Sequence, residues 1–127
     1  MALTVEIREI GDGITVVEPV GEFEVYTSAA VKQVLGPLTE GENCRACLSL
    51  ARVTFLDSKG IGVIVEGTKR ARSHGGDLAL VCPSERFARH IKILRLDEFL
   101  TVVGSDEEAI AKLAGQGGDD GAESQSG

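Results

Sequence analysis

Apolar and polar residues follow one another along the chain in patterns that predict strands first and helices later. Leu3 to Ile10 alternates apolar with polar positions, which is typical of a strand buried on one face. A Gly-Asp-Gly turn at 11–13 leads into a second apolar segment, Ile14 to Val20. These two strands should pair as a hairpin, and Gly21-Glu22 should break the second strand.

A first helix is expected after this hairpin. Thr27 or Ser28 can begin it, because hydroxyl side chains accept the free N–H groups of a first turn. The apolar side of this helix is predicted to consist of Ala30, Val31, Val34 and Leu35. Gly36-Pro37 should kink or end the helix, since proline lacks the backbone donor and clashes with the preceding turn.

The centre of the chain combines a buried strand with a capped helix. Arg45 to Leu50 is a nearly unbroken apolar run, as expected of a central parallel strand, and the run continues to Leu56. The chain then turns at Asp57-Ser58, two good helix caps. A helical repeat follows, with a buried face made of Ile61, Ile64, Val65, Thr68 and Ala71. Ser58 is therefore predicted near the surface, at the positive end of a helix dipole, where an anion can be held.

The other face of this helix contains several glycines, although each interior glycine costs about 1 kcal/mol of helix stability relative to alanine. Its predicted members are Lys59, Gly62, Val63, Glu66, Gly67 and Arg70, with Gly60 beside them in the first turn. One interpretation is a flat docking surface with Val63 exposed between the glycines. The alternative is tight packing of the helix on the sheet.

The second half of the chain repeats the alternation of strand and helix. His74-Gly75-Gly76 should end the central helix, and Leu78 to Cys82 reads as a strand that Pro83 terminates. A helix starting at Ser84 would bury Phe87, Ile91 and Leu94, with a basic stripe on its other side that is either solvated or contacts an acidic partner. The series ends with a short strand within Glu98 to Val103 and a final helix from Ser105. Ala109, Ile110 and Leu113 should dock this helix on the rest of the domain.

This order predicts one α/β domain over residues 1–114. The predicted series is β-β-α-β-α-β-α-β-α, with a mixed, largely parallel sheet of four to five strands and about four helices. Residues 115–127 contain Gly, Asp, Ser and Gln with almost nothing to bury, so an acidic, glycine-rich, disordered tail is expected there.

Three segments of the chain resemble one protein family. Asp57-Ser58-Lys59-Gly60-Ile61-Gly62 resembles the D-S-[S/T]-G-[L/I]-G signature of bacterial anti-sigma factor antagonists, which are STAS domains. Gly21-Glu22-Phe23-Glu24 resembles the G-E-[L/I]-D that ends the family's second strand, and residues 75–81 resemble its G-G-x-L-x-L-V strand entry. The resemblance spans about residues 3 to 113 and implies the same α/β architecture.

The resemblance also implies a function. In the family, the serine after the aspartate, here Ser58, is phosphorylated by a serine/threonine kinase that is itself the anti-sigma factor. The unphosphorylated protein binds that kinase and so releases a sigma factor, phosphorylation ends the binding, and a serine phosphatase acts transiently. The implied partner-binding residues are Glu24, Asp57, Lys59, Gly60, Gly62 and Val63. A monomer is expected.

Two positions depart from the family pattern. Lys59 replaces the usual Ser or Thr, and Glu24 replaces the strand-end Asp. Neither removes the hydroxyl of Ser58, but Lys59 adds a cation beside it that could hold a phosphate or change which kinase docks. An alternative with the same fold is an accessory subunit of a lipid-transporting ABC system, in which this serine region contacts a nucleotide-binding subunit.

Net charge and hydropathy argue against nucleic acid as a partner and against a membrane-spanning segment. The net charge of −7 argues against a nucleic-acid backbone as a partner. No apolar run approaches the roughly 18 to 20 residues of a membrane span, and residues 1–8 lack the features of a signal peptide. A cytoplasmic protein is therefore expected.

The three cysteines and Ser58 are candidates for chemistry as well. Cys44 and Cys47 form a C-x-x-C spacing, but this pair opens a strand rather than a helix and no second ligand pair completes a zinc site. These thiols and Cys82 are expected to be ordinary and buried, although a dithiol redox protein is an open alternative. Ser58 lacks the base and oxyanion site of a nucleophile, and no phosphate-binding loop is present, so neither an enzyme nor a cofactor is predicted.

Overall fold

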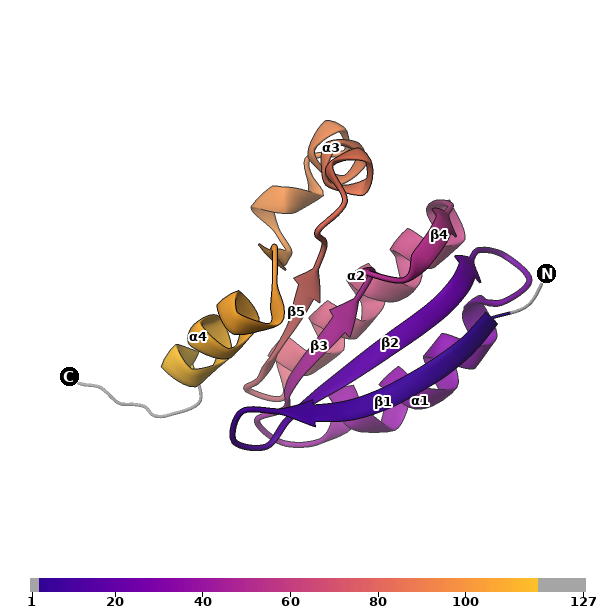
Figure 1. Ribbon diagram of the computed structural model, residues 1–127. Coiled ribbons are helices and arrows are strands. Elements are labelled where there is room, and N and C mark those ends of the chain that lie inside the picture. The colour runs from indigo at the N-terminus through magenta and orange to yellow at the C-terminus, as the bar shows by residue number, and fades with distance from the viewer. Residues whose placement is uncertain (1–2, 117–127) are drawn as a thin grey trace.

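The computed structural model describes residues 3–116, in which a mixed sheet is covered by helices on both faces (Figure 1). The strands are β1 (Leu3–Ile10), β2 (Ile14–Phe23), β3 (Arg45–Ser49), β4 (Val53–Leu56), β5 (Asp77–Val81) and β6 (Thr101–Val103). The helices are α1 (Ser28–Glu40), α2 (Ser58–Ser73), α3 (Glu85–Ile93), the short 3-10 helix η1 (Leu96–Glu98) and α4 (Asp106–Gln116). The predicted tail, residues 115–127, overlaps the end of α4 at residues 115 and 116, and the rest of it lies outside the described residues.

The sheet has the order β1-β2-β3-β5-β6, and β4 pairs with the far end of β2. Among the described strands, only β1 and β2 pair antiparallel, which confirms the predicted hairpin and the largely parallel sheet. The carboxyl ends of the parallel strands therefore meet at one edge, from which α1, α2, α3 and α4 begin.

The expected single strand from Arg45 to Leu56 is two strands in the structure, so the sheet has six strands instead of four to five. The break is a turn in which the Val53 N–H donates to the Leu50 carbonyl at 3.1 Å. Strand β2 accommodates both halves because its register shifts between Gly21 and Glu22, where Gly21 has a positive φ of 123°. Gly21 therefore bends β2 rather than ending it, which corrects the predicted break.

Each face of the sheet has its own core. The larger core lies under α1 and α2 and includes Val31, Leu35, Ile64 and Leu48. The smaller core lies under α4, where Ala109 and Leu113 are fully buried, as predicted.

Helix α1 continues past Pro37 to Glu40. Of the two expectations for Gly36-Pro37, a kink or an end, the end is therefore wrong. The residues on either side of the proline, Leu35 and Thr39, are buried. Their packing outweighs a cost of about 3 kcal/mol for an interior proline, because tertiary contacts supply most of a helix's stability. The predicted apolar position Ala30 is exposed.

After β5, one expectation fails and the expected short strand is found in part of its range. Leu94 is 47 % exposed instead of buried, because α3 ends at Ile93 and Arg95 takes a left-handed conformation that turns the chain away. The last strand is confined to Thr101–Val103, since the segment before it forms η1. The predicted cap of α3 is confirmed, with the Ser84 hydroxyl accepting from the Phe87 N–H at 3.4 Å.

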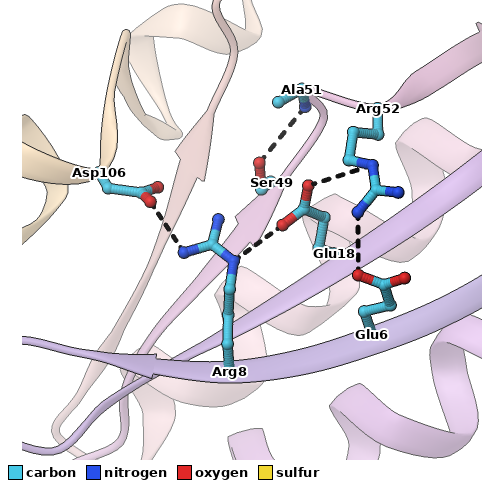
Figure 2. A network of polar contacts seen from close by, with 7 residues as sticks. All are labelled: Glu6, Arg8, Glu18, Ser49, Ala51, Arg52 and Asp106. Atoms are coloured by element: carbon cyan, nitrogen blue, oxygen red, sulfur yellow. Dashed lines mark hydrogen bonds and ion pairs between the residues drawn. The ribbon is translucent and has the colours of Figure 1, made fainter.

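An ion-pair network lies on the α4 side of the sheet, across β1 and β2 (Figure 2). Glu18 is only 5 % exposed, and its carboxylate accepts from the Arg8 Nε at 2.9 Å. Arg8 also donates to Asp106 at the start of α4, at 2.8 Å, and these two carboxylates raise the pKa of the Arg8 guanidinium. Arg8 thus ties the hairpin to the N-terminus of α4.

Candidate functional site

The start of α2 is held in place by the side chain of Asp57. Its Oδ1 accepts from the N–H groups of Lys59 and Gly60, both at 3.0 Å, which makes Asp57 the N-cap. Its Oδ2 accepts from the Val25 N–H at 3.0 Å. One carboxylate therefore fixes the helix tip against the β2–α1 loop, the segment between Phe23 and Ser28.

Ser58 is the first residue of α2 and is exposed, as predicted. Within residues 3–116, its hydroxyl forms no hydrogen bond, so the oxygen is free to react or to contact a partner. The positive end of the helix dipole lies beneath it. The N–H groups of Lys59 and Gly60 are already occupied by Asp57, however, so those two donors are not available to an anion on Ser58.

A shallow groove of about 510 Å³ borders Ser58 between α1 and α2. Its lining residues are Lys32 of α1 and, from α2, Ser58, Lys59, Ile61, Gly62, Val63, Val65 and Glu66. We call this the Ser58 groove. It brings together four of the predicted site residues: Ser58, Lys59, Gly62 and Val63.

The glycines of α2 fall into two classes. A Cβ on Gly60 would come within 2.7 Å of the Phe23 carbonyl oxygen, and a Cβ on Gly67 within 3.2 Å of the Leu78 side chain. These two glycines allow close packing, so the docking interpretation fails for them. A Cβ on Gly62 would meet nothing within 4 Å, and Gly62 lines the Ser58 groove.

The expectation that Val63 is exposed is wrong. Val63 is only 6 % exposed, and Gly67 is buried with it, because α2 is covered by α1 as well as by the sheet. Val65, predicted to be buried, is only partly so. A single apolar repeat in the sequence cannot show that a helix is covered on two sides.

Glu24 shapes the β2–α1 loop instead of facing the Ser58 groove. It is 8 % exposed, and its carboxylate accepts from the Tyr26 N–H at 2.6 Å. Its backbone carbonyl accepts from the Ser28 N–H at 2.8 Å. Glu24 thus positions the residues next to Asp57 and does not line the groove itself.

Three exposed apolar side chains near this helix tip were not singled out from the sequence. Val25 and Tyr26, in the β2–α1 loop, are 53 % and 85 % exposed, and Phe55 at the end of β4 is 45 % exposed. The bond from the Val25 N–H to Asp57 keeps this loop beside Ser58. An apolar pair in a short loop between a strand and a helix cap is the sequence signal that could have revealed them.

The cysteines are buried free thiols, as predicted. Cys44 belongs to the core under α1 and α2, whereas Cys47 belongs to the core under α4. The two thiols are therefore separated by the sheet, which leaves the dithiol alternative without geometric support. Burial raises the pKa of the Cys47 thiol to about 12, so its reactive thiolate is scarce at neutral pH.

Other chemistry finds little support in the part of the chain that the structure describes. No group of three or more His, Cys, Asp or Glu side chains in residues 3–116 is arranged to hold a metal ion. His74 lies at the C-terminus of α2, at the opposite end from Ser58, with its Nδ1 2.9 Å from the Arg70 carbonyl oxygen. Every helix within those residues is too short or too polar to cross a bilayer.

The fold and the helix tip together define a small α/β domain with an exposed serine at the start of α2. The chain belongs to the STAS domain family, whose model matches residues 5–109. It is 32 % identical over 111 residues to the anti-sigma-B factor antagonist of Bacillus subtilis, covering 87 % of this chain and 99 % of that protein. The anti-sigma-B factor antagonist of Listeria monocytogenes is 28 % identical over 108 residues, covering 85 % of this chain and 95 % of that protein.

Solved structures agree with this assignment. A protein from Thermotoga maritima superimposes with a TM-score of 0.77 at 28 % identity, covering 87 % of this chain and 94 % of that one. An anti-sigma factor antagonist from Mycobacterium paratuberculosis gives a TM-score of 0.73 at 23 % identity, covering 89 % and 95 %, which supports the fold alone. The predicted family and fold class are thus confirmed, and the relatives are named as regulatory antagonists rather than as enzymes.

Proposed function

We propose that this protein binds an anti-sigma factor of the serine/threonine kinase class through the Ser58 groove while Ser58 is unphosphorylated. Binding withholds the anti-sigma factor from its sigma factor, which is thereby released. Phosphorylation of Ser58 by the bound kinase ends the association, and a serine phosphatase restores it. The names of the relatives support an anti-sigma factor as the partner class.

The observation that carries this proposal is the exposed hydroxyl of Ser58, which lies at the rim of a groove and forms no hydrogen bond within the described residues. A kinase must reach the hydroxyl oxygen with the terminal phosphate of its nucleotide. An exposed residue at a helix tip allows that approach, and Asp57 holds the tip in one conformation.

The charges around Ser58 explain how a phosphate would act as a switch. Phosphorylation adds about −1.5 to −2 charges at pH 7. The neighbouring Asp57 carboxylate already occupies two N–H groups of the helix start and is itself negative, so the added charge is only partly compensated within this protein. On docking, the phosphate would lose its water as well.

The size of this effect is sufficient for a switch. Burying an ion costs several kcal/mol unless it is paired. If about 3 kcal/mol of that cost is not recovered, binding weakens more than a hundredfold, since about 1.4 kcal/mol corresponds to tenfold. Lys32 and Lys59 line the same groove, and their positive charges reduce the cost of burying the phosphate. Binding is therefore lost most completely when the partner's own surface repels the phosphate.

The apolar residues around the tip supply affinity for the unmodified form. Val25, Tyr26 and Phe55 are large and exposed, and aromatic residues are enriched among those that dominate interface energies. Together with the Ser58 groove they form a candidate docking surface that contains both apolar anchors and the residue to be modified.

The test measures binding of the purified protein to candidate kinase anti-sigma factors by calorimetry. Ser58→Ala should bind like the natural sequence, whereas Ser58→Asp should lose most of its affinity. Ser73→Asp is the matched control, because Ser73 is an exposed serine at the other end of α2 and receives the same added charge. Equal affinities for Ser58→Ala and Ser58→Asp would reject the switch.

Affinity capture from cell extracts tests the class of partner. The proposal expects a kinase that, given ATP, labels Ser58 in the natural sequence and leaves Ser58→Ala unlabelled in peptide mass spectra. Recovery of a transporter's nucleotide-binding subunit with no Ser58 labelling would favour the transport alternative instead.

A further inference from the structure

Strand β1 lies at one edge of the sheet and is longer than the other edge strands, β4 and β6. Its eight residues pair with β2 on one side only. Within residues 3–116, no backbone hydrogen bond joins its other side to another segment. In an antiparallel ladder, alternate residues direct their N–H and C=O groups to that free side, so β1 offers a row of unused donors and acceptors.

An exposed apolar side chain lies at the middle of this edge. Leu3 and Val5 pack against the core under α1 and α2, but Ile7, on the same face of β1, is 59 % exposed. It is one of the large aliphatic side chains that the described chain leaves in solvent.

The charges on either side of Ile7 match those of a second copy of the same strand. When two β1 strands pair antiparallel about a two-fold axis at Ile7, residue 6 of one copy faces residue 8 of the other. Glu6 then lies opposite the second copy's Arg8, and this pair occurs twice by symmetry. Opposite charges facing each other across a ladder stabilise it, whereas like charges destabilise it.

Both side chains have bonding capacity left for such a pair. Arg8 uses its Nε and Nη1 toward Glu18 and Asp106, and within the described residues its Nη2 has no partner (Figure 2). Glu6 accepts from Arg52 through Oε1 alone, at 2.9 Å. Pairing would join the ion-pair networks of the two copies into one, on the face of the sheet that Figure 2 shows.

We propose that two copies of this protein associate through β1, antiparallel and about a two-fold axis at Ile7, into one continuous sheet. The Ser58 groove is lined by α1 and α2 residues and by none from β1, so it is outside the pairing strand. One strand edge buries little area compared with a standard interface of about 1,600 Å². The association is therefore weak and depends on concentration. At low protein concentration the protein is the monomer expected from the sequence.

Sedimentation equilibrium over a wide concentration range tests this with the full chain. The natural sequence should shift from monomer toward dimer as concentration rises. Ile7→Lys places two ammonium groups at the axis and should weaken the association at least about tenfold. Glu6→Arg, which places arginine opposite the second copy's Arg8, should do the same, and both positions are exposed enough to leave the fold intact.

The matched control is Ile93→Lys, since Ile93 is 71 % exposed on α3, away from β1. It should associate like the natural sequence. At high concentration, amide exchange should also slow at alternate β1 residues. A monomer at every concentration would overturn the proposal. So would unchanged association of Ile7→Lys, or an equal loss in Ile93→Lys.

Discussion

The substitution Gly62→Ala separates the two roles that a glycine can have in α2. Gly62 lies in the interior of the helix, where alanine is favoured over glycine by about 1 kcal/mol. A Cβ at this position meets nothing within 4 Å, so the gain is not offset by a clash. We therefore expect Gly62→Ala to raise the free energy of unfolding by about 1 kcal/mol.

The same methyl group should reduce partner binding. Gly62 lines the Ser58 groove beside Ser58 and Lys59, so the added group projects into the surface proposed for docking. If the partner's backbone approaches this glycine closely, overpacking by one methyl costs about 1–3 kcal/mol, or roughly 5- to 150-fold in affinity. The variant would then be more stable but a poorer binder.

Gly60→Ala is the companion variant, since the two glycines are two residues apart in one helix. Its Cβ would lie 2.7 Å from the Phe23 carbonyl oxygen and 2.9 Å from the Leu56 side chain, and a backbone oxygen cannot move aside cheaply. Strain of about 1–3 kcal/mol should cancel or exceed the helix gain.

Urea unfolding measures stability, and calorimetry with the anti-sigma factor measures binding. If Gly62→Ala binds as tightly as the natural sequence, the partner does not approach this glycine, and the reasoning about the docking face is refuted. If Gly62→Ala is destabilised, the assignment of open space at this position is refuted as well.

Three further predictions concern the docking surface, the ion-pair network and the buried Cys47. Tyr26→Ala should leave stability within about 0.5 kcal/mol, because the side chain is 85 % exposed, yet weaken partner binding about tenfold or more by calorimetry. Arg8→Ala should lower the free energy of unfolding in urea by about 2–3 kcal/mol, because it leaves the buried Glu18 carboxylate without its closest cation. Adding Glu18→Leu to this variant should recover much of the lost stability, and no recovery would contradict an ionic cause. Since burial raises the pKa of Cys47 from 9.0 to about 12, the folded state favours the neutral thiol, so stability should be full below pH 9 and fall as pH rises toward 12. The unfolding free energy of Cys47→Ala should fall less steeply over that pH range, and an identical slope would contradict the assignment.

Local patterns predicted most of the fold because each element's signal was contained in its own sequence. The strand Leu3–Ile10, the Asp57 cap and the His74-Gly75-Gly76 stop all depend on near neighbours, and the structure confirms them, although Ile7 is exposed rather than packed against the core with Leu3 and Val5. The division between β3 and β4 could not be predicted in the same way, since it depends on how β2 bends at Gly21, thirty or so residues earlier.

The structure confirms the predicted placement of Asp57 and Ser58 at the tip of α2, but not the predicted burial of the residues around them. Asp57 and the exposed Ser58 follow from cap chemistry, which is local. The burial of Val63 and the inward role of Glu24 depend on α1 and on the β2–α1 loop, which the apolar repeat of α2 does not encode. The same holds for Gly60 and Gly62, whose different roles depend on whether another segment lies against them.

The most direct test of the central claim compares two forms of the same protein that differ only at the Ser58 oxygen. The protein is prepared unmodified and fully phosphorylated at Ser58, and the affinity of each form for the purified anti-sigma factor is measured at equal ionic strength. The account predicts that the phosphorylated form binds more than about a hundredfold more weakly and recovers its affinity after treatment with a serine phosphatase. Equal affinities of the two forms would contradict it.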